Sequence, residues 1–269
     1  MIRDLATPQG EATDWLINQD ARVLCPDDEK LVQRWVITVM YFSSGGDNWF
    51  QCSAAGSDSC GTEDPFEFKR RFLSEFSECE WAGISCNSEG SVIEVEFEQN
   101  NLVGTIPTEM GVLTDLRIWG MERGDLSGRI PSEIGNLSNL IFLDLDFNDL
   151  TGSIPTELFT LTTLTQLDLN NNHLTGDVAQ IGVFEDLQFL QLHNNDFTGE
   201  IPPSTGALTG LGTFTLHNTF FSGTMPTTVC DLLATNGGQL TSLIADCAAP
   251  APGVDPEIFC DCCTDCRGA

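Results

Sequence analysis

The sequence has few basic residues. It contains 11 Lys and Arg against 40 Asp and Glu, which gives a net charge of −29 at pH 7. Such a charge repels phosphate backbones and anionic lipid headgroups, so we expect no nucleic-acid and no membrane-surface partner. It favours a medium of high ionic strength or a cationic partner, and both readings stay open. The hydrophobic fraction of 41% is typical of a folded chain, so the charge does not indicate disorder.

Long hydrophobic runs and catalytic motifs are also absent. No stretch approaches the ~20 residues of a membrane-spanning helix, and the segment after Met1 has no apolar signal-peptide core. We therefore expect no direct membrane insertion, and we expect that a signal or an anchor has been removed. The sequence has no glycine-rich phosphate loop, no G-x-S-x-G, no H-E-x-x-H and only three histidines. We predict that the chain is not an enzyme.

Cysteine is missing from the middle of the chain. The 11 cysteines fall into two groups, and none lies between Cys86 and Cys230. At this density we expect disulfides, and hence an oxidising, extracellular compartment. The odd count leaves one thiol unpaired or bridged to another chain, and the full connectivity stays open. The expected disulfide cysteines are the close pairs Cys79 and Cys86, and Cys52 and Cys60, together with Cys230 and Cys247.

Two short motifs are weaker signals. The tail from Cys260 to Cys266 contains the C-x-x-C spacing of a zinc site, but no histidine lies nearby and we favour disulfides there. Asn136 begins the single Asn-X-Ser/Thr sequon and is a predicted glycosylation site in a secreted protein.

A repeat of about 24 residues dominates the sequence. LIFLDLDFNDLTGSIPTELFTLTT and LQFLQLHNNDFTGEIPPSTGALTG share the template LxxLxLxxNxLxGxIPxxLGxLxx. Six repeats at steps of 24, 24, 24, 23 and 24 residues predict a solenoid. In the short step Val178-Ala179 replaces Ile-Pro, and we expect an irregularity there. The first positions of the repeats are Val92, Leu116, Leu140, Leu164, Leu187 and Leu211.

Each repeat is expected to form one short parallel strand and to return through an extended Gly-Pro segment. The sequence thus predicts an α/β solenoid, a right-handed leucine-rich-repeat superhelix with a parallel β-sheet on its concave side. An asparagine follows the strand in most repeats, where its amide can satisfy buried backbone groups. Gly124 and Thr219 interrupt this ladder. Its members are Asn100, Asn148, Asn172 and Asn195.

A solenoid must close its apolar ends. Residues 1–91 are predicted to form a helical, disulfide-braced N-terminal cap, and residues 92–234 hold the six repeats. Residues 235–269 are predicted to form a degenerate repeat and a cysteine-rich C-terminal cap. Helical periodicity in the N-terminal cap covers residues 11–20, 27–44 and 65–76.

Alternate strand residues face the concave surface, so the third, fifth and seventh positions of the repeats form the candidate ligand-binding site. Its N-terminal half is acidic, and like charges on neighbouring strands repel one another. A basic peptide, another cationic ligand or a calcium ion would relieve this repulsion, although a chain with 40 acids places some on any face. No other cofactor is expected. The acidic candidates are Glu94, Glu96, Glu98, Glu122, Asp144, Asp146 and Asp168.

Apolar and histidine side chains complete the candidate site. Exposed apolar residues beside the acids are typical of a binding surface, although scattered ones are normal. His193 and His217 share a column, where they can bind a transition metal, change charge near neutral pH, or simply belong to a polar face. We assign no metal site to them. The apolar candidates are Ile118, Phe142, Phe147 and Phe189.

The repeat and its flanks resemble a known family. The LxGxIP element resembles the plant-type class of extracellular leucine-rich repeats, and the segment from Cys79 to Cys86 is similar to the cap that precedes them. Nearly the whole chain is similar to the extracellular leucine-rich-repeat proteins of diatoms and related algae, from which the insert at residues 51–65 departs. This likeness is carried by Thr7-Pro8-Gln9, Asp14-Trp15-Leu16, Gln33-Arg34-Trp35, Gly45-Gly46-Asp47-Asn48-Trp49 and Cys260-Asp261-Cys262-Cys263-Thr264-Asp265-Cys266.

The resemblance implies a secreted or cell-surface module for recognition or adhesion. We predict a receptor-like ectodomain that binds an extracellular protein, peptide or glycan through its concave face. The alternatives are a cell-wall or structural protein and an inhibitor of a polysaccharide-degrading enzyme. Glycan cleavage by Asp144 and Asp168 would need a desolvated acid in a cleft, which we do not expect on an open face. Ice or mineral binding has little support, because few flat threonine ladders are visible.

Overall fold

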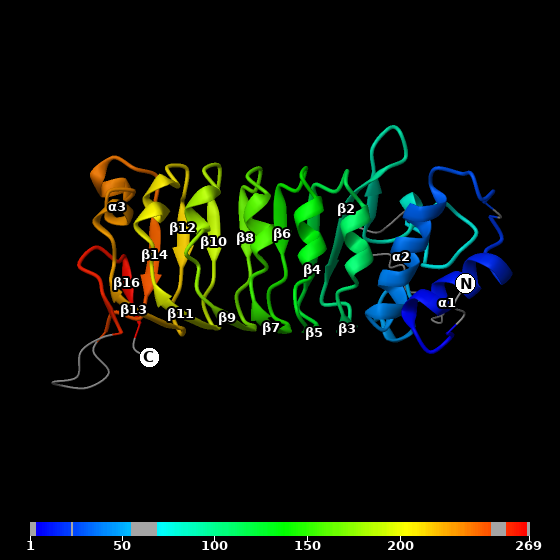
Figure 1. The fold of residues 1–269 in the computed structure, drawn as a ribbon, viewed down its shortest axis with the longest axis horizontal. Coiled ribbons are helices and arrows are strands. Elements are labelled where there is room, and N and C mark those ends of the chain that lie inside the picture. The colour runs from blue at the N-terminus through cyan, green and yellow to red at the C-terminus, as the bar shows by residue number, and fades with distance from the viewer. Residues whose placement is uncertain (1–3, 23, 55–68, 249–256, 268–269) are drawn as a thin grey trace.

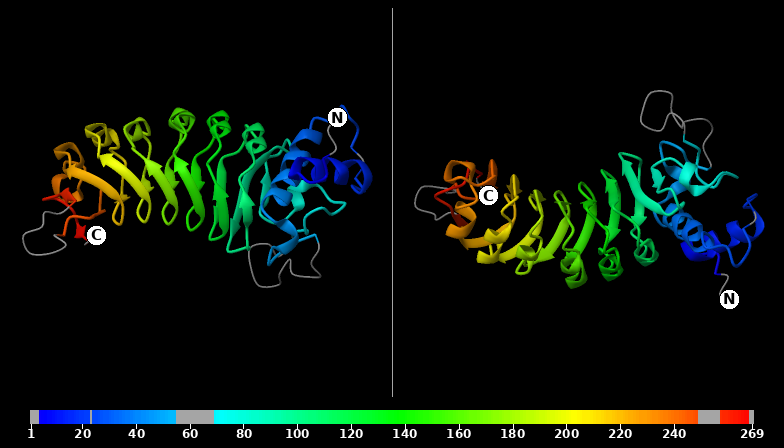
Figure 2. Two further views of the ribbon diagram at one scale, coloured as in Figure 1. Left: turned by 60° about the horizontal axis from the view of Figure 1, so that its bottom comes forward. Right: turned by 90° about the horizontal axis from the view of Figure 1, so that it is seen from above.

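The computed structural model shows a curved stack of repeats with a cap at each end (Figures 1 and 2). It describes residues 4–22, 24–54, 69–248 and 257–267. The predicted α/β solenoid with a parallel sheet, a helical N-terminal cap and a cysteine-rich C-terminal cap is confirmed. None of the helices in the described part of the chain is long and apolar enough to cross a membrane.

A nine-stranded sheet runs the length of the molecule. The alternation of the template turns Leu143 and Leu145 into the core, where both are fully buried. Neighbouring strands are parallel with residues one repeat apart opposite each other, so Phe142 lies between Ile118 and Gln166. Among the strands that the structure describes, β1 alone pairs antiparallel, with β2. The strands in order are β1 (Ile84–Cys86), β2 (Val92–Glu98), β4 (Ile118–Glu122), β6 (Phe142–Asp144), β8 (Gln166–Asp168), β10 (Phe189–Gln191), β12 (Thr213–Thr215), β14 (Ser242–Ala245) and β16 (Asp265–Cys266).

A second, seven-stranded sheet forms where we expected only extended returns. Three of its strands, β7, β9 and β11, begin directly after a ladder asparagine, and each contains a glycine with positive φ, such as Gly152 at 79°. These segments are short, and the pairing that makes them strands comes from neighbouring repeats. The sequence of a single repeat therefore does not predict this sheet. Its strands are β3 (Val103–Thr105), β5 (Asp125–Gly128), β7 (Asp149–Ser153), β9 (His173–Gly176), β11 (Asp196–Glu200), β13 (Phe220–Thr224) and β15 (Ile258–Phe259).

Short 3₁₀ helices carry the chain back to the next strand. In η5 the turn begins after Pro155, whose extended backbone cannot continue a helix. The expected irregularity in the fourth repeat is confirmed, because η6 has three residues where η5 has five. The 3₁₀ helices are η1 (Gly46–Asn48), η2 (Glu78–Glu80), η3 (Thr108–Val112), η4 (Ser132–Asn136), η5 (Thr156–Thr160), η6 (Ile181–Val183), η7 (Pro203–Ala207) and η8 (Ala234–Asn236).

The N-terminal cap contains α1 (Pro8–Asn18), whose first turn is capped by the Thr7 side chain, and α2 (Leu31–Ser43). Helix α2 packs on η3 and β3 of the first repeat, and α1 packs on α2 at the end of the molecule (Figure 1). The predicted third helix at residues 65–76 is wrong where the structure describes it. Residues 69–76 are irregular because the Arg70 backbone N–H donates to the Glu80 carbonyl and the Phe72 side chain is buried among aromatic rings. Residues 65–68 lie outside the described ranges.

The buried Arg34 holds the cap together. Its guanidinium donates to both Asp20 oxygens at 2.7 and 2.8 Å and to Glu78 at 3.2 Å. It also stacks on Trp15 and Trp81, with centroid distances of 5.0 and 4.6 Å. All five donors of a guanidinium need partners when buried, and these contacts, with two backbone carbonyls, supply them.

The C-terminal cap extends both sheets. β16 adds to the nine-stranded sheet beside β14, and β15 adds to the second sheet beside β13. A further short helix, α3 (Thr227–Cys230), precedes it. Both sheets run from the caps through the repeats, so the boundaries at residues 91 and 234 stay predictions.

The disulfides follow the two cysteine groups. The expected Cys79–Cys86 bridge is confirmed. Cys230 and Cys247 are disulfide-bonded as expected, each to a tail cysteine, which leaves no free tail thiol for zinc. Cys52 is bonded, whereas Cys60 lies outside the described residues. Within the described chain the free thiol is the exposed Cys25. The tail bridges are Cys230–Cys262, Cys247–Cys266 and Cys260–Cys263.

Candidate functional site

The predicted acidic columns are continuous on the nine-stranded sheet. Glu94, Glu96 and Glu98 of β2 lie opposite Ile118, Gly120 and Glu122 of β4. Asp144 of β6 is opposite Gly120 on one side and Asp168 of β8 on the other. Asp146 follows β6 directly and donates its backbone N–H to Asp144 Oδ1 at 3.1 Å. Carboxylates from four consecutive repeats are therefore brought together.

Three of these acids are more deeply placed than we expected. Asp144, Asp146 and Asp168 are 6%, 8% and 3% exposed, although they occupy strand positions that we expected to face the concave surface. Neighbouring polar side chains cover them. Gln191 Nε2 donates to Asp168 Oδ2 at 2.6 Å, and Asn170 donates its backbone N–H to Asp168 Oδ1 at 3.1 Å. Glu96 and Glu98 are exposed, whereas Glu94 and Glu122 are half-buried.

Burial and mutual repulsion raise the pKa values of this cluster. Burial raises the pKa of Asp144 to about 8, helped by the charges of Asp168 and Glu122. Burial and the Asp146 charge raise the pKa of Glu122 to about 7. Burial raises the pKa of Asp168 to about 6 against opposing hydrogen bonds from Asn170. The pKa of Asp146 is also raised by burial, and Arg123 opposes this. Burial and the neighbouring negative charges therefore keep Asp144 largely protonated at neutral pH.

The same cluster could hold a hard metal ion. One carboxylate oxygen each from Glu122, Asp144 and Asp146 lies within 4.8 Å of the others. Asp146 Oδ1 is buried and has no hydrogen-bond partner. Calcium takes 6–8 oxygen ligands, so these three would need further oxygens from water or a ligand. The calcium alternative stays a prediction.

The apolar candidates divide between two places. Ile118 and Phe142 are direct neighbours on the sheet and half-buried, and Phe189 is separated from Phe142 by Gln166. The expected exposure holds only for Phe147, at 46%. This residue lies beyond β6 in a turn with φ 47°, where Arg123 stacks on its ring at 5.3 Å. The Phe147 side chain lines a groove beside the concave sheet.

The histidine pair is stacked and neutral. The rings of His193 and His217 lie 4.5 Å apart at an interplanar angle of 13°. Burial, and after it the charge of the neighbouring His217, lower the pKa of His193 to about 4. The prediction that the charge of this histidine changes near neutral pH is therefore wrong. Among the described residues, the groups of three close metal-ligating atoms contain no histidine.

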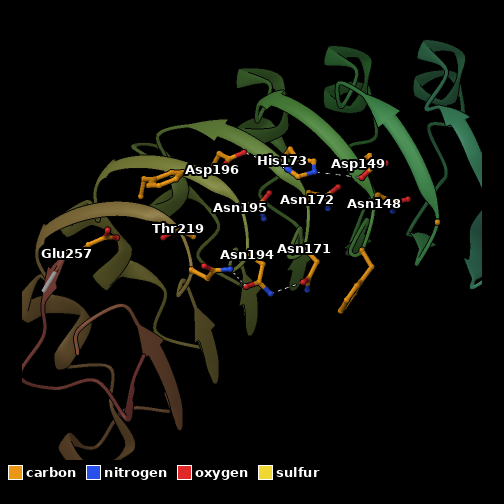
Figure 3. Close-up of a pocket in the computed structure, with 14 residues that line it drawn as sticks. Asn148, Asp149, Asn171, Asn172, His173, Asn194, Asn195, Asp196, Thr219 and Glu257 are labelled. Atoms are coloured by element: carbon orange, nitrogen blue, oxygen red, sulfur yellow. Dashed lines mark hydrogen bonds and ion pairs between the residues drawn. The ribbon is translucent and has the colours of Figure 1, made fainter. Parts of the chain in front are cut away.

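Sequence reasoning missed a groove of about 630 Å³ at the turn between the two sheets (Figure 3). The residues just before and just after the ladder asparagine line it, and these two template positions were the available signal. Asn136, the predicted glycosylation site, is exposed at the end of η4, away from the residues that line this groove. The groove residues are Gly124, Phe147, Asn148, Asp149, Asn171, Asn172, His173, Asn194, Asn195, Asp196, Asn218, Thr219, Phe220 and Glu257.

Comparison with known proteins agrees with this architecture. A Leucine Rich Repeat family model matches residues 139–161, 163–182 and 186–208, within the third to fifth repeats. With the strand–turn–strand stack around them, these matches identify the chain as a leucine-rich-repeat protein. No curated protein sequence matches it.

Solved plant structures share the fold. The ectodomain of the Arabidopsis thaliana membrane receptor kinase GASSHO1/SCHENGEN3, in complex with CASPARIAN STRIP INTEGRITY FACTOR 2, is 29% identical with a TM-score of 0.59, over 64% of this chain and 20% of that one. The BIR3–SERK2 complex from A. thaliana matches with 32% sequence identity and a TM-score of 0.50, and the match covers 55% of this chain and 80% of that one. A plant ice-binding protein matches with 29% sequence identity and a TM-score of 0.57, and the match covers 64% of this chain and 55% of that one. This chain spans a fifth of the first ectodomain, 20% of its length.

Proposed function

We propose that this chain is an extracellular recognition module whose concave face binds a cationic segment of a protein or peptide. The observation that carries this proposal is the buried carboxylate cluster of Glu122, Asp144, Asp146 and Asp168, whose pKa values are raised. Within the described ranges, the one Arg or Lys ion pair with an acidic candidate joins Arg123 Nε to Glu98 Oε1 at 3.6 Å. Most acids of this cluster therefore have no cationic side chain of this chain as a partner within the described ranges.

An arginine or lysine side chain suits this cluster chemically. A guanidinium donates in two directions at once and can bridge two carboxylates. Its binding would release the protons that the raised pKa values retain. Ile118 and Phe142 lie beside the acids and offer an apolar contact for the rest of the segment. The salt dependence of such a complex should be strong at its exposed rim and weaker at the buried acids.

The comparisons support a partner of this kind. The GASSHO1/SCHENGEN3 ectodomain is solved with another factor bound, and that interaction belongs to that protein. The disulfides support an oxidising compartment, and thus a secreted or cell-surface location. The cap motifs support kinship with the algal proteins that they resemble. An inhibitor of a basic polysaccharide-degrading enzyme, or a cell-wall component with a basic partner, would use the same face.

Calorimetric titration with an arginine-rich peptide tests the proposal. The variant Asp144→Asn/Asp146→Asn should weaken binding at least tenfold, because it removes two buried carboxylates without changing side-chain size. The matched control, Glu133→Gln/Glu157→Gln, removes two charges from η4 and η5 and should bind like the unmodified chain. Equal loss in both variants would show only general charge attraction. Saturable binding of calcium alone, lost in Asp144→Asn/Asp146→Asn, would favour a calcium site over a peptide site.

A second candidate is an ice-binding surface, which one observation favours. Exposed hydroxyls occupy one template position in five successive repeats on the second sheet, staggered along it because Thr151 lies opposite His173 and Thr175 opposite Ser153. Ser127 and Thr151 in this row each donate to a glycine carbonyl of the preceding repeat, at 3.0 and 3.1 Å. Thermal hysteresis, lost in Thr151→Lys/Thr175→Lys, would support it. The row is Ser127, Thr151, Thr175, Thr198 and Ser222.

A further inference from the structure

A row of amide side chains forms one wall of the groove at the turn between the sheets. Asn171, Asn194 and Asn218 occupy the same position in successive repeats, each with φ between 53° and 55°. Asparagine tolerates this left-handed conformation better than most residues do. Asn218 Nδ2 donates to Asn194 Oδ1 at 2.7 Å, and Asn194 Nδ2 donates to Asn171 Oδ1 at 2.7 Å (Figure 3). The row is therefore ordered before any ligand arrives.

This ordering leaves hydrogen-bonding capacity free. An amide carries two N–H donors and a carbonyl with two lone pairs. Asn194 uses one N–H and one lone pair within the row. Asn194 therefore keeps one N–H donor and one carbonyl lone pair for a ligand, which two adjacent hydroxyl groups of a sugar ring can match.

The backbone of the groove is already paired. The N–H groups of Asn171 and Asn194 donate to the carbonyls of His193 and His217, both at 3.0 Å. Asn172 and Asn195 donate in the same way to Asn194 and Asn218, at 3.1 and 3.2 Å. An extended peptide that adds as a strand needs free backbone groups, and this site offers side chains instead. That favours a ligand with many hydroxyls over a peptide backbone.

The opposite wall excludes anionic ligands. His173 lies between Asp149 and Asp196, with its two ring nitrogens each 3.8 Å from a carboxylate oxygen (Figure 3). These distances exceed hydrogen-bond length, so the carboxylates retain lone pairs for a ligand. Glu257 adds a further acid, and no Lys or Arg is among the described residues that line the groove. Phosphorylated, sulfated or uronic-acid ligands would therefore be repelled.

Aromatic rings stand at both ends. Phe147 is 46% exposed and Phe220 is 59% exposed, and both line the groove. They lie three repeats apart, which at ~4.8 Å per strand is roughly 14 Å. Apolar C–H faces of sugar rings pack well against exposed aromatic side chains of this kind.

We propose that this groove binds a neutral, extended glycan of about three sugar rings, aligned with the solenoid axis. The central rings contact Asn171 and Asn194 on one side and Asp149 and Asp196 on the other. The terminal rings pack on Phe147 and Phe220. This site is separate from the concave carboxylate cluster and takes a ligand of different chemistry.

Titration of the disulfide-intact chain with neutral hexasaccharides of β-1,4-glucose, β-1,3-glucose and β-1,4-mannose tests the proposal. At least one should bind saturably, with a Kd that rises about tenfold in Phe220→Ala and in Asn194→Asp, which tolerates the same φ but loses the amide donors. Ser222→Ala, an exposed change on β13 outside the groove, should leave binding unchanged. A hexamer of galacturonic acid should not bind.

Two controls separate this proposal from the concave site. Asp144→Asn/Asp146→Asn should leave glycan binding unchanged, and its effect on peptide binding tests the proposed function alone. Circular dichroism and thermal unfolding show whether each groove variant folds. No saturable binding of any neutral glycan at millimolar concentration overturns the proposal, as does binding that neither groove variant weakens. Competition for the groove by an uncharged peptide that binds more tightly than every glycan also overturns it.

Discussion

Asp144 should make the protein less stable as the pH rises from 5 to 8. Its pKa is raised to about 8 by burial and by Asp168 and Glu122, whereas an unfolded aspartate has a pKa of ~3.9. Between these values the folded state binds more protons than the unfolded state, so the free energy of unfolding falls as pH rises. An acid held at a raised pKa thus stabilises only while it is protonated.

Asp144→Asn should remove this penalty. A shift of roughly 4 units corresponds at most to about 6 kcal/mol, at about 1.4 kcal/mol per unit. The acids share this repulsion and relax together, so we expect about 2 to 3 kcal/mol of added stability at pH 8 and little change at pH 4.5. The amide oxygen can still accept the Asp146 N–H, and the neutral side chain is not repelled by the charges of Glu122 and Asp168.

Urea unfolding at half-unit steps from pH 4.5 to 8.5 measures this. Glu157→Gln, an exposed change on η5, removes the same charge without burial and controls for the net charge of −29. The free energy of unfolding of Glu157→Gln should exceed that of the unmodified chain by less than about 0.5 kcal/mol at any pH. If Asp144→Asn destabilises the protein at pH 8, or gains no more than Glu157→Gln, the argument from burial fails.

Three other changes should have defined effects. Arg34→Lys should lose about 3 kcal/mol or more in urea unfolding, because an ammonium cannot reach Asp20, Glu78 and the backbone carbonyls together; a loss below 1 kcal/mol would contradict the role of the guanidinium. Asn172→Ala should lose about 2 to 3 kcal/mol, because its amide accepts from Leu150 N at 3.0 Å and donates to Leu145 O at 2.9 Å; an unchanged urea midpoint would refute this. Cys247→Ser should lower the thermal midpoint by freeing the tail strand β16, and the loss should match that of Cys266→Ser; unequal losses would argue against the pairing.

The sequence was sufficient for the repeat architecture because its signal recurs. Each leucine of the strand is buried against the same position in the next repeat, so period and burial predict one another. The asparagine ladder was equally accessible, since a buried amide beside a bend has few alternatives to backbone bonding. Asn148 and Asn172 make the bonds expected of it.

Features that depend on pairing between distant or irregular segments were not accessible. The second sheet exists only through contacts between repeats. The helix predicted at residues 65–76 has apolar spacing, but Phe72 packs in the cap against Tyr41 and Trp49, which are distant in sequence. The burial of Asp144 and Asp168 depends on their neighbours' side chains, which alternation alone does not describe.

The most direct test of the account is carbodiimide cross-linking of a bound lysine-containing basic peptide, followed by mass spectrometry. This reagent joins an amine to a carboxylate in direct contact. The account predicts cross-links to Glu98, Glu122 and Asp146 on the concave face, and their loss when the Asp144→Asn/Asp146→Asn variant is used. Cross-links confined to Glu133 and Glu157 on the 3₁₀ turns, or to Asp149 and Asp196 in the groove, would contradict it.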